Sequence, residues 1–137
     1  MSLYESLTAL NMILVEGDPL LSDALLQFFR TKGCPVLVFS SAEKALQAME
    51  KDRFDVVISD HSLPGLDGVT FLMRARRLQP DTIRILLTDY PPPMAAHSHQ
   101  RGQTNIDDVI RKPLTITELE SSLRRLLEAS PKVLNTS

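Results

Sequence analysis

The chain has 137 residues, a length typical of a single domain, and its 43% hydrophobic content excludes a disordered protein. The net charge of −2 argues against a general nucleic-acid-binding protein, and no apolar run approaches the roughly 20 residues of a membrane span. The single cysteine, Cys34, excludes an intramolecular disulfide and is typical of a reducing compartment, so we expect a cytoplasmic protein. Residues 1–3 resemble a remnant of an expression tag and are left out of the fold prediction.

The first half of the chain predicts two strands, each followed by a helix. A strand over 11–15 leads to Asp18, an N-cap residue before a proline, and to a helix that ends at Gly33. A second strand over 36–39 leads to a helix whose start at Ser40 has the Ser-x-x-Glu pattern of a capping box.

The second half opens with a nearly continuous apolar run over 54–59, which predicts a strand covered on both faces. Proline and glycine fill the loop that follows this strand, as expected for a turn. A helix is predicted to begin at Asp67 or Gly68 and to end before Pro80. A fourth strand is predicted over 83–87, where the residues are again almost all apolar.

The segment after the fourth strand has an irregular pattern. Three prolines at 91–93 exclude a helix at that point, and a short helix is predicted over 94–101. A short strand is predicted over 109–111, and Thr115 begins a capping box for the last helix. Residues 130–137 are polar and are interpreted as a tail or a truncated linker.

This alternation of strands and helices predicts the α/β class, with a five-stranded parallel sheet and helices on both faces. Right-handed crossovers favour a doubly wound sheet in the order 2-1-3-4-5, with an irregular helix between the fourth and fifth strands. The domain is expected to span 8–129. In this order the switch point lies between the first and third strands, which end in Glu16 and Asp60.

Polar side chains with complementary chemistry follow the predicted strands. Glu16 and Asp60 supply carboxylates, Thr88 supplies a hydroxyl, and Lys112 supplies an ammonium before Pro113. Parallel strands end at one edge of a sheet, so we expect these groups to gather there. An acid, a hydroxyl and an ammonium together suit a phosphoryl group held on a carboxylate.

These residues resemble the receiver domain of two-component response regulators over roughly 12–127. The resemblance rests on Ile13-Leu14-Val15-Glu16, Asp55-Val56-Val57-Ile58-Ser59-Asp60, Leu63-Pro64-Gly65, Asp67-Gly68, Ile85-Leu86-Leu87-Thr88 and Lys112-Pro113. It implies that Asp60 is the phosphoacceptor, that Thr88 donates to a phosphoryl oxygen and that Lys112 pairs with the phosphate. It also implies a Mg²⁺ site formed by Glu16, Asp60 and the backbone carbonyl of Ser62.

Two positions depart from the pattern of that family. Gly17 replaces the second acid that touches the metal, so we expect weak Mg²⁺ binding. Asp18 lies one residue further on, and we interpret it as a helix cap in preference to a metal ligand. Val109 stands where the family usually has a tyrosine or phenylalanine, and Tyr90 is not expected from sequence to take over that role.

The resemblance implies a phosphorelay receiver, phosphorylated on Asp60 by a histidine kinase or a phosphotransfer protein. Its output surface would comprise the helix before the fifth strand, that strand and the last helix, and the same surface suits a homodimer. An effector domain would follow Ser137, and neither direct nucleic-acid binding nor membrane binding is expected.

The alternative is a pseudo-receiver, an interaction module that works without phosphorylation because the acidic metal pair is incomplete. An enzyme such as an aspartate-nucleophile phosphatase is disfavoured, since Ser62 stands where its general acid would be. His61 is interpreted either as a gate to the site or as an ordinary loop side chain, and both interpretations stay open.

Overall fold

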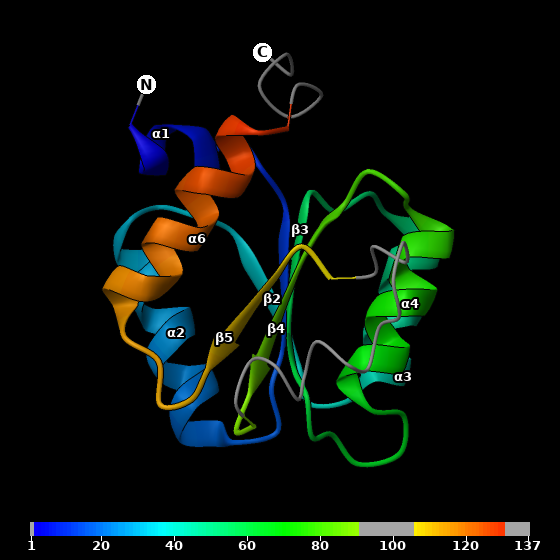
Figure 1. The fold of residues 1–137 in the computed structure, drawn as a ribbon. Coiled ribbons are helices and arrows are strands. Elements are labelled where there is room, and N and C mark those ends of the chain that lie inside the picture. Colours follow the sequence, from blue (N-terminus) through cyan, green and yellow to red (C-terminus); the bar gives the residue numbers. More distant parts are fainter. Residues whose placement is uncertain (1, 91–105, 131–137) are drawn as a thin grey trace.

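A parallel sheet of five strands forms the middle layer of the fold, with helices on each side (Figure 1). We describe residues 2–90 and 106–130 of a computed structural model. The strands are β1 Met12–Val15, β2 Val36–Phe39, β3 Val56–Asp60, β4 Ile83–Thr88 and β5 Asp108–Arg111. Their order is β2-β1-β3-β4-β5 and every neighbouring pair is parallel, which confirms the predicted doubly wound sheet.

Helices cover both faces of this sheet in the described part of the chain. They are α1 Leu3–Leu7, α2 Pro19–Thr31, α3 Ala42–Lys51, α4 Gly68–Leu78 and α6 Ile116–Glu128. Figure 1 shows α1, α2 and α6 on one face and α3 and α4 on the other. None of these described helices is long and apolar enough to cross a membrane. The irregular helix predicted before β5 and the tail after residue 130 lie outside the described residues.

Successive side chains of the central strands point to opposite faces and enter two separate hydrophobic clusters. The cluster on the α2 and α6 face includes the strand residues Met12, Leu14, Val56, Ile58, Ile85 and Leu87. The cluster on the α3 and α4 face includes the strand residues Ile13, Val15, Val57 and Leu86. Because both faces of these strands are largely apolar, most of the polar side chains of the site lie where the strands end.

The starts of three helices agree with the sequence. Asp18 is the N-cap of α2 and accepts a backbone hydrogen bond of 3.0 Å through its carboxylate. Asp67 is the N-cap of α4, which begins at Gly68. Thr115 and Glu118 form the predicted capping box of α6. These caps fix the first turns of the two helices, α2 and α4, that follow β1 and β3.

The capping box predicted at Ser40 is wrong. Ser41, one residue later, is the N-cap of α3 and accepts the backbone N–H of Lys44 at 3.4 Å. The Glu43 carboxylate instead accepts the backbone N–H of Leu66 at 3.3 Å, in the loop between β3 and α4. A tertiary contact therefore takes the carboxylate that the local pattern assigned to the helix start.

The N-terminal helix α1 is absent from the sequence prediction, which assigns no element before residue 11 and begins the domain at residue 8. Leu3 and Leu7 are buried in the cluster on the α2 and α6 face. The Tyr4 hydroxyl donates to the carboxylate of Glu120 in α6. Leu3, Leu7 and Leu10 are spaced as on one face of a helix, and this spacing is the sequence signal for α1.

Candidate functional site

Polar side chains from four strand ends lie at the carboxyl edge of the sheet. Glu16 follows β1, Asp60 is the last residue of β3, Thr88 is the last residue of β4, and Lys112 follows β5. Glu16, Asp60 and Thr88 are buried, although all three are polar. Since β1 and β3 are neighbours, their two acids face the switch point of the sheet, as the sequence predicted.

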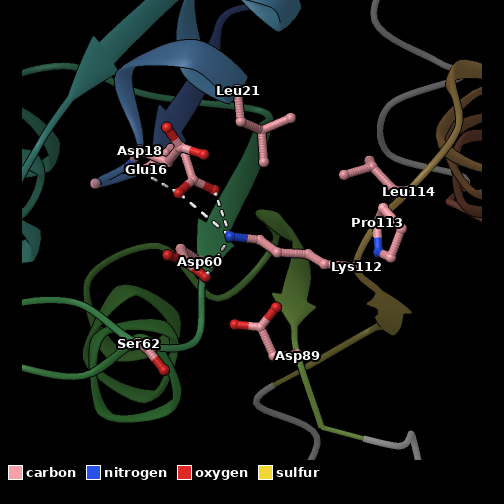
Figure 2. A pocket seen from close by; sticks show the side chains of 10 residues that line it. Glu16, Asp18, Leu21, Asp60, Ser62, Asp89, Lys112, Pro113 and Leu114 are labelled. Carbon is pink, nitrogen blue, oxygen red and sulfur yellow. Dashed lines mark hydrogen bonds and ion pairs between the residues drawn. The ribbon is translucent and has the colours of Figure 1, made fainter.

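The ammonium of Lys112 lies between the two buried acids (Figure 2). Its Nζ is 2.9 Å from Oδ1 of Asp60 and 3.1 Å from Oε1 of Glu16. A further hydrogen bond of 3.3 Å runs from the same nitrogen to Oε2 of Glu16. One ammonium thus faces two carboxylates, and the cluster keeps an excess of negative charge when all three groups are ionised.

Burial and pairing shift the pKa values of this cluster. Burial raises the pKa of Glu16 above its ordinary value, and this effect outweighs the hydrogen bonds from the Asp18 backbone and from Lys112. Burial alone would lower the pKa of Lys112, but its contacts with Asp60 and Glu16 raise it overall. Lys112 is therefore held as the charged ammonium, whereas the ionised form of Glu16 is disfavoured.

These groups line an open cavity of about 790 Å³. Its walls are formed by Glu16, Gly17, Asp18, Leu21, Asp60, Ser62, Asp89, Lys112, Pro113 and Leu114. Asp89 was not identified from the sequence, although its position directly after a strand end is the kind of signal that marked Asp60. Figure 2 shows the Asp89 side chain on the same side of the cavity as Lys112. The cavity is wide enough to admit a phosphoryl group to Asp60.

The donor set of the site fits a divalent cation in part. Glu16 Oε1 and Asp60 Oδ1 are buried and accept no hydrogen bond from the described residues, apart from their ion-pair contacts with Lys112. Carboxylate oxygens are the ligands that Mg²⁺ prefers. No group of three or more acidic, histidine or cysteine side chains in the described ranges is arranged to hold a metal. A Cβ added to Gly17 would meet nothing within 4 Å, so the place of the absent acid is open.

Thr88 does not face this cavity. Its hydroxyl lies 2.7 Å from Nδ1 of His61 and accepts the backbone N–H of Tyr90 at 3.1 Å. The Thr88 side chain is fully buried and is not among the groups that line the cavity. The structure therefore brings Glu16, Asp60 and Lys112 into one cluster and holds Thr88 in a neighbouring one.

This fold, with an acid at the end of β3 paired to a lysine after β5, defines the chain as a receiver-type signalling domain. Residues 12–124 match the family model of the response regulator receiver domain, and the chain belongs to that family.

Curated relatives of the chain include transcriptional regulators. It is 32% identical over 122 residues to PfeR, a transcriptional activator protein of Pseudomonas aeruginosa. It is 35% identical over 119 residues to DctD, a C4-dicarboxylate transport transcriptional regulatory protein of Rhizobium meliloti. These alignments cover 89% and 86% of this chain but only 39% and 25% of the relatives. The chain thus spans less than two fifths of the length of either relative.

Solved receiver domains have the same fold. The signal receiver domain of an HD domain-containing protein from Pseudomonas fluorescens superposes with a TM-score of 0.79 at 30% identity, covering 89% of this chain and 97% of that one. The receiver domain of a sensor histidine kinase from Pseudomonas aeruginosa, solved with a magnesium ion in its active-site cleft, gives a TM-score of 0.73 at 24% identity. That alignment covers 87% of this chain and 98% of the other. At this level of identity it supports a shared fold and nothing about function.

Proposed function

We propose that the chain accepts a phosphoryl group on Asp60 from the phosphohistidine of a histidine kinase or a phosphotransfer protein. The observation that supports this proposal best is the Lys112 ammonium, 2.9 Å from Oδ1 of Asp60 at the open edge of the sheet. The hydrophobic packing of the fold does not by itself explain why Lys112, just after β5, meets Asp60, at the end of β3, beside a cavity. A transferred phosphoryl group needs this pairing of nucleophile and cation.

The transfer step follows from the chemistry of the two groups. An oxygen of the Asp60 carboxylate attacks phosphorus, a P–O bond forms, and the P–N bond of the phosphohistidine breaks. The electron pair of that bond leaves with the imidazole, which takes up a proton from solvent, and Asp60 becomes a mixed anhydride. Lys112 offsets the negative charge that accumulates when the two anions approach each other.

We also propose that Mg²⁺ assists this transfer and binds weakly. Glu16, Asp60 and the backbone carbonyl of Ser62 would hold it, and the ion would supply positive charge at the phosphoryl oxygens. Gly17 offers no third carboxylate, and Asp18 uses its own carboxylate to cap α2. Weak binding is the expected consequence of this reduced ligand set.

The same observations favour one alternative function, a pseudo-receiver that binds a partner without being phosphorylated. The absent acid at Gly17 and the occupation of both carboxylates by Lys112 support this alternative. In that case Lys112 serves only to neutralise two buried acids.

The partners are proposed from the family and from the relatives. Because the relatives are longer transcriptional regulators, we propose an effector domain beyond Ser137 and a site of action in the cytoplasm. The face formed by β5 and α6 is proposed as the output surface and as a surface for homodimers. We propose no turnover of an external substrate, so release of phosphate from a phosphate monoester would contradict this part of the proposal.

Intact mass measurement tests the proposed function directly. The protein is incubated with acetyl phosphate and Mg²⁺, and separately with a competent kinase, and the gain of one phosphoryl group is measured. The wild type should gain the group, and Asp60→Asn, which keeps the shape of the side chain, should not. A wild type that stays unmodified under both conditions supports the pseudo-receiver instead.

A further inference from the structure

The residue directly after the phosphoacceptor is held in place by its backbone. The N–H of His61 donates to the carbonyl of Leu87 in β4 at 2.7 Å, and its own carbonyl accepts the N–H of Gly68 at 2.9 Å. A Cβ at residue 68 would overlap the carbonyl oxygen of Asp60, so only glycine allows the start of α4 to approach this closely. The side chain of His61 therefore starts from a fixed position between β4 and α4.

From that position the imidazole contacts the last residue of β4 and a residue just beyond it. Its Nδ1 lies 2.7 Å from the hydroxyl oxygen of Thr88. Its ring lies edge-on to the ring of Tyr90, with the two centroids 5.2 Å apart and the planes at 70°. Tyr90 also donates its backbone N–H to the same hydroxyl at 3.1 Å. His61 and Tyr90 thus both bond to the Thr88 hydroxyl and also contact each other.

The hydrogen-bonding capacity of a hydroxyl limits what Thr88 can do in this state. A threonine hydroxyl has one proton to donate and two lone pairs. One lone pair accepts the N–H of Tyr90. If Nδ1 of His61 accepts, the only hydroxyl proton is used. If Nδ1 carries hydrogen, it occupies the second lone pair, and the hydroxyl proton stays free but points away from both donors. In both tautomers His61 and Tyr90 fix the direction of the hydroxyl, and Thr88 stays outside the cavity wall.

We infer that His61 is a positioning residue that holds the Thr88 hydroxyl away from Asp60 until Asp60 is phosphorylated. This inference rests on the proposed function, in which Thr88 donates to a phosphoryl oxygen. Because Thr88 lies outside the cavity wall, that donation requires its hydroxyl to move away from Nδ1 of His61. The imidazole then loses a partner on the side where it contacts Tyr90, so the aromatic contact changes with the state of Asp60. His61 and Tyr90 thereby provide a coupling that Val109 has no ring to provide.

Two substitutions of His61 separate its hydrogen bond from its bulk. His61→Phe keeps a ring beside Tyr90 but has no atom that can bond to Thr88. His61→Asn places an amide where Nδ1 lies, so it restores the bond with a smaller side chain. Thr88→Val removes the hydroxyl and keeps the shape of the side chain. The measured quantity is the rate at which intact protein gains a phosphoryl group from acetyl phosphate and Mg²⁺.

The expected result is a rate that rises roughly two- to tenfold in His61→Phe, the range that corresponds to one neutral hydrogen bond. His61→Asn should restore the rate of the wild type. In a Thr88→Val background, His61→Phe should change nothing. Equal rates in wild type and His61→Phe, or the same gain in the Thr88→Val background, would overturn the inference while leaving phosphorylation of Asp60 intact. An unmodified wild type would instead contradict the proposed function on which the inference rests.

A spectroscopic measurement adds a readout that a structural role alone would not move. The chain has two tyrosines, Tyr4 and Tyr90, so fluorotyrosine labelling gives two ¹⁹F signals that a Tyr4→Phe variant assigns. The Tyr90 signal should shift in the wild type when Asp60 is phosphorylated, and unphosphorylated His61→Asn, which has no ring beside Tyr90, should already differ from the wild type. A Tyr90 signal that stays unchanged on phosphorylation would contradict the proposed coupling.

Discussion

Lys112 binds Glu16 almost as closely as it binds Asp60, with its Nζ 3.1 Å from one carboxylate and 2.9 Å from the other. The acid expected to hold a metal ion is thus already engaged by the cation expected to hold a phosphate. A divalent ion that enters the site must share both carboxylates with this ammonium. Metal affinity, stability and phosphoryl transfer are therefore linked through one side chain.

Restoring the absent acid should strengthen metal binding. We expect Gly17→Asp to bind Mg²⁺ at least about tenfold more tightly, because a third carboxylate joins a ligand set now limited to two. A new side chain fits there, since its Cβ would meet nothing within 4 Å. Titration with Mg²⁺ measures the affinity, and Gly17→Asn controls for the added bulk without the charge. Equal affinities in the aspartate variant and the wild type would contradict the proposed metal site.

Removing the ammonium should destabilise the fold and free the acids for a metal. We expect Lys112→Met to lower the free energy of unfolding by about 1–3 kcal/mol, less than for a fully buried pair because the cavity is open to water. The same variant should bind Mg²⁺ more tightly, and added Mg²⁺ should recover part of the lost stability. Urea unfolding with and without Mg²⁺ measures both effects, with the exposed Lys44→Met as control. A loss of stability that Mg²⁺ does not reduce would argue against competition for the two acids.

The raised pKa of Glu16 predicts a specific dependence of stability on pH. The folded state binds this proton more tightly than the unfolded chain, so the resulting stability is full below the unfolded pKa and is lost as pH rises through the folded pKa. Glu16→Gln removes this titration. The stability of the variant relative to the wild type should therefore increase between about pH 4 and pH 7, by about 1.4 kcal/mol for each unit of the raise.

Urea unfolding of Glu16→Gln and wild type across this pH range measures that difference. The exposed Glu50→Gln serves as the matched control, and its difference from the wild type should stay nearly constant. A relative stability of Glu16→Gln that is flat or falls with rising pH would show that burial does not dominate at this carboxyl.

The N-terminal helix α1 should contribute to stability through its buried leucines. Leu7 is fully buried in the cluster on the α2 and α6 face, so Leu7→Ala should lower the free energy of unfolding by about 2–5 kcal/mol. Leu20 is 82% exposed at the start of α2, and Leu20→Ala should change it by no more than about 0.5 kcal/mol. Denaturant unfolding of the two variants checks the contrast. Equal, small effects would mean that α1 is dispensable to the fold.

The sequence was sufficient to predict the sheet and to place Glu16, Asp60 and Lys112 at its edge, because each of these polar residues lies at the end of a predicted strand. The strand order then brings the three together without any knowledge of side-chain directions. The helix cap at Asp18 was predictable for a similar reason, since its hydrogen bond is local.

Contacts between residues distant in sequence could not be predicted in this way. The use of the Glu43 carboxylate by the backbone of Leu66 depends on how α3 lies against the loop after β3. The contact of Thr88 with His61 depends on the rotamers of two side chains, one at the end of β4 and one just after β3. Helix α1 is a different case, because the spacing of Leu3, Leu7 and Leu10 in the sequence is a local signal for it.

Gly68 limits which substitutions the candidate site can tolerate. Its missing side chain lets the first turn of α4 rest directly on the peptide group between Asp60 and His61. Even an alanine there would force the helix and the end of β3 apart. The Asp60 carboxylate would then shift relative to Lys112, which lies more than 50 residues further along the chain. Substitutions at this position therefore report on the alignment of the site, and a library designed to change partner recognition should keep residue 68 fixed.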